Sequence, residues 1–420
     1  MTSDPTRIYA TYRIETAYPL EKAASVMAGE QSAGTFVKVH GETPELTARY
    51  GARVERITPL GDVSQPALPG ARTPNGDVLY QQAEVVLSFP FDNIGTSLTA
   101  LMTAVGGNLY ELSQFSGLKL IDVQIPRRIL DAYPGPQFGI AGTRRLSGVN
   151  ERPLLGTIIK PSVGLSPDDT AALVRTLCEA GLDFVKDDEL QSNAPYSPLE
   201  ARVKAIMPVI RDYAERTGRR VMYAFNITGD IDDMLRGHDL VLAEGGTCVM
   251  LNVIPVGVAA LAHLRNHAAL PIHVHRAGWG MFGRHPLLGM EYSAYQKFLR
   301  LAGADHLHVN GLQNKFCESD ESVITSARAV LTPLGQGETP MPVFSSGQWA
   351  GQAPDTYAAL NSLDLIYLAG GGIMAHPSGP AAGVASLREA WDAALAGISL
   401  AQHARTHPAL RQSMEMFGAL

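Results

Sequence analysis

Cysteine is scarce in this sequence, and no two cysteines have the spacing of a metal site. Cys178, Cys248 and Cys317 lie far apart in a chain of 420 residues, with no CxxC pair. A zinc site and a disulfide framework are therefore not expected, and three ordinary thiols in a reducing compartment are the simplest interpretation. Residues 1–15 lack the apolar core of a secretory signal, which adds to the prediction of a cytoplasmic protein.

Long apolar runs and long basic runs are also missing. No segment offers about 18 uninterrupted apolar residues, so no membrane-spanning helix is expected. The formal net charge is -7, and no basic cluster would attract nucleic acid or an anionic membrane surface. A hydrophobic content of 45% is enough for a sizeable core. These features predict a soluble protein that acts on a small molecule.

The first third of the chain mixes strand and helix patterns and predicts a small α+β domain, ferredoxin-like, over residues 1–140. Strand-like alternation or apolar runs occur at 7–15, 35–39, 52–57 and 83–90, and helical patterns at 19–28 and 94–105. Residues 131–150, rich in Pro, Gly and Arg, are interpreted as the boundary region.

The remainder, residues 150–420, alternates short apolar strands with helix-length segments. Eight such units predict a closed (β/α)8 TIM barrel. An open doubly wound sheet is the alternative, but no GxGxxG follows the first strand. The eight predicted strands lie at 156–161, 183–189, 221–227, 247–254, 271–277, 306–310, 341–347 and 365–371.

Polar residues gather where these strands end. In a barrel the carboxyl ends of the strands meet at one mouth, where barrel enzymes have their active sites. A single histidine would more often be structural, but polar residues at seven of eight strand ends indicate a ligand site. They are Lys160, Lys186, Asp188, Glu189, Asn226, His273, His275, Arg276, His306, His308, Ser345, Ser346, Gly347 and Gly370 to Gly372.

The segment Phe184-Val185-Lys186-Asp187-Asp188-Glu189 carries the densest charge. Lys186 and Asp188 share one face of a strand, and Glu189 follows at its end. Carboxylates crowded in this way suit a hard cation such as Mg²⁺. The alternative is a lysine that neutralises an acidic surface run, and the six residues alone leave both interpretations open.

Glycine-rich turns follow the last two predicted strands. Backbone N-H groups around Gly347, Gly370 and Gly371 are unshielded by side chains and suit a phosphate. The alternative is a tight turn, which is less favoured because no single turn needs three glycines. Arg276 and His308 would lie opposite. Residues 310–315 have the length of a lid that carries Lys315 over the pocket, whereas a solvated surface lysine is equally compatible.

Several longer motifs together resemble the large subunit of ribulose-bisphosphate carboxylase/oxygenase (RuBisCO). The resemblance covers nearly the whole chain, with the motifs in the same order and at similar spacings. The motifs are GEQSAGTF, GGN, GTIIKPSVGLS, GLDFVKDDE, HVHRA, DHLHVNG and AGGGIMAHPSG.

This resemblance implies roles for individual residues. Lys186 would react with CO₂ to form a carbamate and would bind Mg²⁺ together with Asp188 and Glu189. A protonated lysine repels a cation, so carbamylation would turn it into an oxygen ligand. Lys160 would transfer protons and His275 would assist. At one anionic end the ligand would contact Arg276, His308 and Ser345, and at the other its phosphate would contact Gly347, Gly370 and Gly371.

The resemblance also implies that the site is shared between two chains. Glu30, Thr35 and Asn108 match residues that reach the site from the partner subunit in this family. A homodimer, or a higher homo-oligomer, is therefore predicted.

Departures from the carboxylase pattern argue against carboxylation of ribulose bisphosphate. Ser162 replaces a second lysine, Ile158 a threonine and Phe36 a tryptophan, and the lid reads Leu312-Gln313-Asn314 where the carboxylase is rich in valine and glycine. The sequence is therefore most similar to the RuBisCO-like proteins, or form IV, which act on other phosphorylated keto compounds.

The resemblance predicts a Mg²⁺-dependent decarboxylase. YRIET and AGEQSAGTF resemble the branch that degrades apiose, which implies 3-oxo-isoapionate 4-phosphate as the substrate and an enediolate as the intermediate. Lys315 would hold the departing carboxylate. The alternatives are a transcarboxylase/hydrolase on the same compound, an enolase or isomerase of methionine salvage, and a barrel that binds a sugar phosphate without catalysis.

Overall fold

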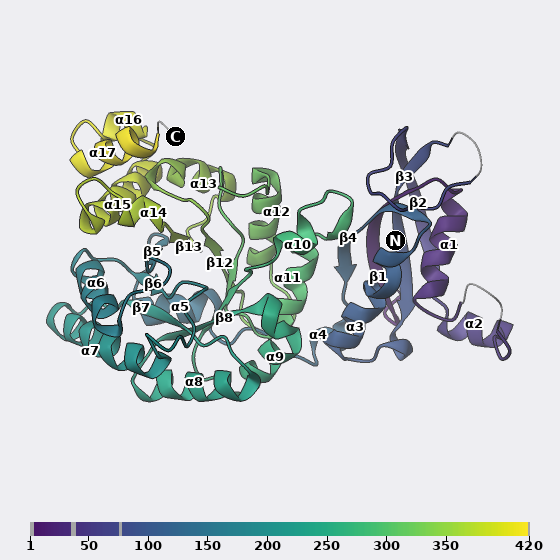
Figure 1. Ribbon diagram of the computed structural model, residues 1–420, viewed down its shortest axis with the longest axis horizontal. Helices are drawn as coiled ribbons and strands as arrows, with labels where there is room; N and C mark the ends of the chain where they lie inside the picture. The colour runs from purple at the N-terminus through teal and green to yellow at the C-terminus, as the bar shows by residue number, and fades with distance from the viewer. Residues whose placement is uncertain (1–3, 35–38, 75–77, 419–420) are drawn as a thin grey trace. The chain divides into compact units, whose positions relative to one another are not determined.

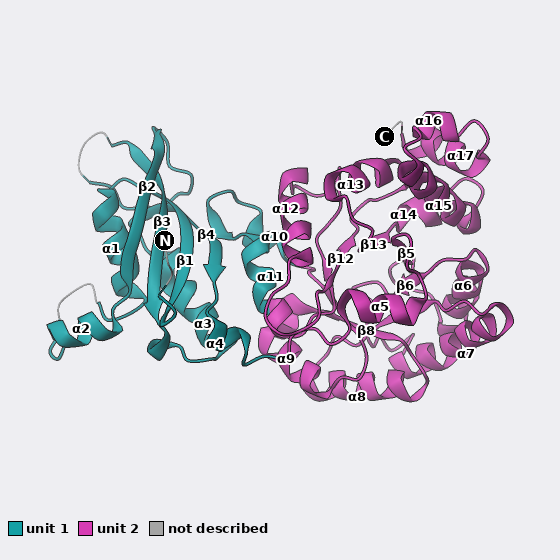
Figure 2. Cartoon of the chain, turned by 180° about the vertical axis from the view of Figure 1, so that it is seen from behind, with its two compact units in different colours: residues 1–133, 278–298 teal, residues 134–277, 299–420 magenta. Residues whose placement is uncertain are grey.

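The computed structural model describes residues 4–34, 39–74 and 78–418, and the chain forms two compact units. The first unit contains Met1–Tyr133 and Gly278–Phe298, and the second contains Pro134–Ala277 and Leu299–Leu420 (Figure 2). The segment Gly278–Phe298 therefore leaves the second unit and joins the first. The sequence pattern did not predict this excursion.

The first unit is built on a five-stranded sheet with the order β10-β4-β1-β3-β2. The pairs β1–β3, β1–β4 and β2–β3 are antiparallel, whereas β10 is parallel to β4. Helix α1 packs against β2 and β3 (Figure 1). The bounds are β1 Arg7–Thr16, α1 Leu20–Glu30, α2 Pro44–Tyr50, β2 Arg53–Val63, β3 Tyr80–Pro90, η1 Phe91–Asn93, α3 Leu98–Val105, η2 Gly107–Glu111, β4 Phe115–Gln124, α4 Arg127–Leu130, α10 Gly280–Gly283 and β10 Leu288–Met290.

Strand β1 shows why the sheet forms. Ile8, Ala10, Tyr12 and Ile14 alternate along it and are fully buried, so one face of the strand contributes to the core. The predicted strands at 7–15, 52–57 and 83–90 are present, but β4 and β10 were not predicted. Most of the predicted strand at 35–39 lies outside the described residues.

The second unit is a closed eight-stranded parallel barrel, which confirms the predicted fold. All eight predicted strands are present, and pairing of β11 with β9 closes the ring. The strands are β5 Leu154–Ile158, β6 Phe184–Lys186, β7 Met222–Asn226, β8 Cys248–Asn252, β9 Ile272–His275, β11 His306–His308, β12 Met341–Phe344 and β13 Ile366–Leu368.

Helices follow the barrel strands and surround them (Figure 1). Their starts follow capping rules: at α6, Ser166 accepts a hydrogen bond from the Asp169 backbone N-H at 3.1 Å, and Pro167 comes next. Helix α5 lies within the predicted boundary region. The helices are α5 Gly139–Ser147, α6 Pro167–Glu179, α7 Leu199–Thr217, α8 Ile231–Ala243, α9 Val253–His267, α12 Asp320–Leu331, η3 Ala350–Gln352, α13 Ala353–Leu360, α14 Gly371–Met374, α15 Pro380–Ala396, α16 Leu400–His403 and α17 Pro408–Phe417. Helix α11 Tyr292–Leu301 begins in the first unit and ends in the second.

The barrel interior is filled by apolar side chains below the mouth. Phe184, Met222, Met250 and Leu368 are among the fully buried residues of this core. At Gly156 an added Cβ would lie 2.5 Å from the Leu368 side chain and 2.6 Å from the Phe184 carbonyl, so only glycine fits there. Among the described residues, no helix combines the length and the apolar character needed to span a bilayer.

Candidate active site

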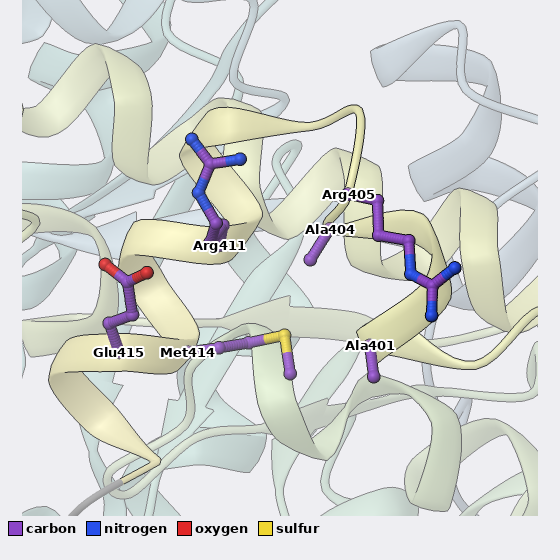
Figure 3. A pocket seen from close by; sticks show the side chains of 6 residues that line it. All are labelled: Ala401, Ala404, Arg405, Arg411, Met414 and Glu415. Carbon is purple, nitrogen blue, oxygen red and sulfur yellow. The ribbon is translucent and has the colours of Figure 1, made fainter.

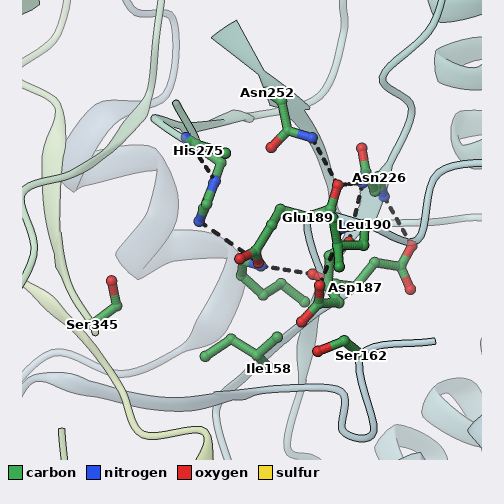
Figure 4. Close-up of polar contacts among 12 residues, drawn as sticks. Ile158, Ser162, Asp187, Glu189, Leu190, Asn226, Asn252, His275 and Ser345 are labelled. Atoms are coloured by element: carbon green, nitrogen blue, oxygen red, sulfur yellow. Dashed lines mark hydrogen bonds and ion pairs between the residues drawn. The ribbon is translucent and has the colours of Figure 1, made fainter. Parts of the chain in front are cut away.

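Strands β5 and β6 bring two lysines and two carboxylates together at the barrel mouth. Figure 4 shows one of the carboxylates, Glu189, near Asn226, Asn252 and His275. Lys160 Nζ donates to Asp188 Oδ2 at 2.5 Å and to Ser162 Oγ at 2.8 Å. Lys186 Nζ lies 3.7 Å from Glu189 Oε2. The structure thus brings together the residues that the sequence predicted as a metal site and a proton donor.

Lys186 is the most deeply buried of these groups. Its side chain is 0% exposed, and Nζ donates to the Asp187 carbonyl at 2.7 Å. Burial lowers the pKa of Lys186, although the carboxylates of Glu189 and Asp188 act in the opposite direction. Compared with a solvent-exposed lysine, a larger fraction of Lys186 is therefore in the neutral amine form. The neutral amine is the nucleophilic form that can react with CO₂.

Asp187, the third carboxylate of the segment, does not face the mouth. It accepts hydrogen bonds from Tyr223 OH at 2.6 Å and from the Asn226 backbone N-H at 2.9 Å, and it pairs with buried Arg202 at 3.1 Å. Because successive strand residues point to opposite sides, Asp187 fixes the wall while its neighbours face the site.

Two asparagines position Glu189 through its backbone. Asn252 Nδ2 donates to the Glu189 carbonyl at 2.8 Å, and Asn226 Nδ2 donates to the same oxygen at 3.2 Å (Figure 4). Asn252 ends the fourth barrel strand, the one strand for which no polar end residue was predicted. Asn252 is the polar residue near the end of the predicted strand TCVMLNVI, and this position could have identified it as a site residue.

Histidines line the opposite wall. His275 Nε2 lies 3.8 Å from Glu189 Oε2, and the ring of His275 lies 4.4 Å from that of His308, centroid to centroid. Burial, and then the Lys186 ammonium, hold the pKa of His275 well below its usual range. His275 is therefore neutral, and its contact with Glu189 is polar rather than an ion pair. His308 Nδ1 contacts Ser345 Oγ at 3.0 Å.

Arg276 has a partner that the sequence analysis missed. Its guanidinium pairs with the Glu318 carboxylate, which follows the predicted lid. Asn310 Nδ2 donates to Glu318 Oε2 at 2.6 Å, and Ser322 Oγ donates to Oε1 at 2.8 Å. Sequence spacing offered no signal for this pair, because 42 positions separate the two residues.

The glycines and Lys315 belong to the loops after β11, β12 and β13. Gly347 has a φ of +89°, and a Cβ there would lie 3.4 Å from the Cβ of Lys315. The Lys315 backbone N-H donates to the Ser346 carbonyl at 3.1 Å, and Lys315 itself is exposed. A Cβ added at Gly370 would lie 3.7 Å from the Lys160 side chain, and a Cβ added at Gly371 would have no neighbouring atom within 4 Å. The predicted phosphate turn is therefore open and adjoins Lys160.

The residues predicted to come from a partner subunit lie in the first unit. Asn108 Nδ2 donates to Glu30 Oε1 at 3.2 Å, so these two form one polar group. Thr35 lies outside the described residues.

The donor set fits a hard cation once Lys186 is converted to a carbamate. Asp188 and Glu189 offer carboxylate oxygens. In the structure, Asp188 is paired with the ammonium group of Lys160 and Glu189 with that of Lys186. A second group with ligand-like geometry, His238, Asp239 and His267, lies on α8 and α9. His238 Nε2 accepts from the Ala269 N-H at 3.0 Å, so its proton is on Nδ1 and is donated to Asp239. Its hydrogen bonds make that group a link between the two helices.

Two surface hollows lie elsewhere in the second unit and include none of the predicted site residues. One, of 320 Å³, is lined by α16, α17 and the segment between them, including Arg405, Arg411 and Met414 (Figure 3). The other, of 540 Å³, lies near the amino-terminal ends of β5 and β6, where Arg152 pairs with Asp183.

Two family models together match most of the chain. Residues 1–129 match the ribulose bisphosphate carboxylase large chain, N-terminal domain, and residues 139–417 match the catalytic domain of the same large chain.

Curated relatives match over nearly their full length. A 3-oxo-isoapionate-4-phosphate transcarboxylase/hydrolase of Xanthobacter autotrophicus is 54% identical over 97% of this chain and 98% of that protein. A 3-oxo-isoapionate-4-phosphate decarboxylase of Rhizobium etli is 47% identical over 98% of both. These matches confirm the resemblance that the motifs indicated.

Solved structures have the same fold. A rubisco-like protein from Burkholderia fungorum superimposes with a TM-score of 0.91 at 46% identity, over 98% of this chain and 100% of that one. A dimeric archaeal Rubisco from Hyperthermus butylicus gives a TM-score of 0.86 at 29% identity, over 100% and 98%.

Proposed function

Since the chain belongs to the ribulose bisphosphate carboxylase large chain family, we propose that it is an enzyme that removes the carboxyl group of 3-oxo-isoapionate 4-phosphate. The observation that carries this proposal is the cluster of Lys160, Lys186, Asp188 and Glu189 at the barrel mouth. Relatives that share about half of the sequence are named for this substrate. Ser162 and Ile158, where carboxylases differ, argue against carboxylation of ribulose bisphosphate.

Lys186, as a carbamate, would hold Mg²⁺ together with Asp188 and Glu189. When bound, the cation supplies Lewis-acid polarisation of substrate oxygens. Low solvent access strengthens the electrostatic interactions of Lys186 and Asp188, which are both almost completely buried, whereas Lys160 and Glu189 are partly exposed.

The remaining steps use the side chains of the mouth. The substrate is a β-keto acid, so its carboxyl carbon leaves as CO₂ while the electron pair of the broken C-C bond moves into the ketone and forms an enediolate. Lys315 would hold the departing carboxylate. Lys160, oriented by Ser162 and Asp188, would then donate a proton to the carbon left behind.

The ends of the ligand would be held on two sides of the mouth. Backbone N-H groups around Gly347, Gly370 and Gly371 would bind the phosphate, because no side chain shields them. Arg276, His308 and Ser345 would contact the opposite end.

A second candidate is the transcarboxylase/hydrolase reaction on the same substrate. The specific observation in its favour is the identity of 54% to a relative with that name, compared with 47% for the decarboxylase. Both reactions break the bond to the carboxyl group, so the same residues serve either outcome.

One experiment separates these reactions. We would incubate the protein with Mg²⁺, bicarbonate and 3-oxo-isoapionate 4-phosphate labelled with ¹³C in its carboxyl group. A decarboxylase releases the label as CO₂, whereas a transcarboxylase/hydrolase retains it in a non-volatile acid. Recovery of unchanged substrate would reject both reactions and leave a methionine-salvage enolase or isomerase, or a binding protein, to be tested.

We also propose that the active form is a homodimer or a larger homo-oligomer of such dimers. Support comes from Glu30 and Asn108, which match residues that complete the site of a neighbouring chain in this family. The similar archaeal structure is described as dimeric.

A further inference from the structure

Glu318 places a negative charge at the end of the site where the family resemblance implies an anion-binding group. Its carboxylate pairs with the guanidinium of Arg276. The Arg276 side chain is 6% exposed and that of Glu318 is 16% exposed, so water screens the pair only weakly.

Hydrogen bonds fix Glu318 in this position. Asn310 Nδ2 donates to Oε2 at 2.6 Å and Ser322 Oγ donates to Oε1 at 2.8 Å, so each carboxylate oxygen has a donor besides any contact with Arg276. Asn310 is itself held, because its Oδ1 accepts from Ser346 Oγ at 2.8 Å. The carboxylate is thus part of the wall, not a mobile surface group.

Among the described residues assigned to this end of the site, the charges of Arg276 and Glu318 cancel. Arg276 contributes one positive charge and Glu318 one negative charge. His308 adds none, because burial holds its pKa well below the usual range, and its Nδ1 contacts the neutral Ser345 hydroxyl. A phosphate dianion would have to lie beside a fixed carboxylate, and like charges at such close range in a desolvated site repel each other and weaken binding.

We propose that Glu318 is a specificity-determining residue that makes the end formed by Arg276, His308 and Ser345 accept an uncharged, hydroxyl-bearing group and reject a second phosphate. The substrate class is then restricted to keto sugar acid monophosphates. This inference rests on the proposed function, and it replaces the anionic end that the family resemblance implied. A hydroxyl group suits the end chemically, since it can donate to Glu318 and accept from Arg276 or Ser345.

The test compares two unreactive probes that differ by one phosphate. Ribitol 5-phosphate and ribitol 1,5-bisphosphate lack a carbonyl group, and their Kd values can be measured by calorimetry with Mg²⁺ and bicarbonate present. Wild type should bind the bisphosphate at least about tenfold more weakly than the monophosphate. Glu318→Gln should raise the affinity for the bisphosphate by at least about tenfold and change that for the monophosphate little.

Two further variants act as controls. Glu318→Asp keeps the charge and should keep the wild-type ratio of the two Kd values. Glu321→Gln removes the same charge from an exposed position three residues away and should also keep that ratio. If Glu318→Gln does not fold, the wild-type ratio remains a test, because equal or tighter binding of the bisphosphate by wild type would overturn the inference.

Tighter binding of the bisphosphate by wild type, or equal effects of Glu318→Gln and Glu321→Gln, would overturn the inference. Failure of both probes to bind would overturn it together with the proposed phosphate site. If the ratios behave as expected but the labelled substrate is not consumed, only the proposed reaction is rejected.

Discussion

Lys186 combines complete burial with carboxylate neighbours, and this combination makes its charge state the central property of the site. We expect activity to require Mg²⁺ and to rise on preincubation with CO₂, because Lys186 can be a ligand only as a carbamate. Lys186→Ala should abolish both turnover and the dependence on CO₂, as measured by release or rearrangement of the labelled carboxyl carbon.

The matched control is Lys204→Ala, because Lys204 is exposed on α7 and pairs with Glu200 at the surface. It should leave turnover and CO₂ dependence unchanged. Full wild-type activity in a chelated, CO₂-free buffer would contradict the assignment of Lys186.

Lys315 tests whether a carboxylate leaves the substrate. If it holds the departing carboxylate, Lys315→Met should greatly reduce CO₂ release. Metal-dependent exchange of a substrate-analogue proton with solvent should persist, because exchange needs only the metal ligands and a base. Exchange followed by NMR and CO₂ release followed by trapping give the two rates. Equal loss of both would make Lys315 a general anchor of the lid or the phosphate.

At the scale of elements, a row of histidines on β11 and β9 runs through the barrel and contacts α5. His306 Nε2 contacts Thr143 Oγ1 at 2.7 Å, and His306 Nδ1 contacts His273 Nδ1 at 3.3 Å. His273 Nε2 contacts His308 Nε2 at 2.7 Å. A neutral imidazole has one donor and one acceptor nitrogen, so the row is satisfied only while its members are uncharged.

This row makes the stability of the barrel depend on pH. Burial lowers the pKa of His306 to about 3 and that of His273 and His308 well below the usual range. At a pH between these folded-state pKa values and the unfolded-state pKa of about 6.5, the unfolded chain binds more protons than the folded chain does. The free energy of unfolding should therefore fall as the pH drops below about 6.5, by about 1.4 kcal/mol per pH unit for each histidine.

Urea unfolding between about pH 7.5 and about pH 5 measures this slope. His306→Gln should reduce the slope by the contribution of one histidine, whatever its effect on stability at neutral pH. The control His263→Gln changes an exposed histidine of α9 and should leave the slope as in wild type. An unchanged slope in His306→Gln would show that the row is not the source of the pH dependence.

At the scale of the whole molecule, the proposed shared site can be tested by mixing inactive variants. Glu30→Gln and Lys186→Ala damage the contributions of two different chains. If subunits exchange at random in a dimer, about a quarter of all sites regain both intact residues. Turnover after exchange should recover to about this fraction of the wild-type rate.

The control is a mixture of Glu30→Gln with the double variant Glu30→Gln/Lys186→Ala, in which no combination restores a site. Absence of recovery in the first mixture, after subunit exchange is verified by mass spectrometry, would mean that each site is built from a single chain.

The sequence by itself determined the barrel and most of the polar residues at its mouth. Short apolar strands at regular spacing specify closed βα units, because each strand must be buried on both sides. Lys160, Lys186, Asp188 and Glu189 were identifiable because they directly follow or end such strands. The strands β4 and β10 were missed, since β10 is only three residues long and pairs with a strand about 170 positions earlier.

Only the tertiary structure decided which charges meet. Strand alternation already placed Asp187 on the other side from Asp188, but the partner of Asp187, Arg202, lies 15 positions away and could not be identified from the sequence. Glu318 is 42 positions from Arg276, and no local periodicity relates them. Strand order and loop packing bring such side chains within contact distance. Strand order and loop packing are properties of the whole fold, because backbone pairing and burial of apolar side chains determine them more strongly than any single ion pair does.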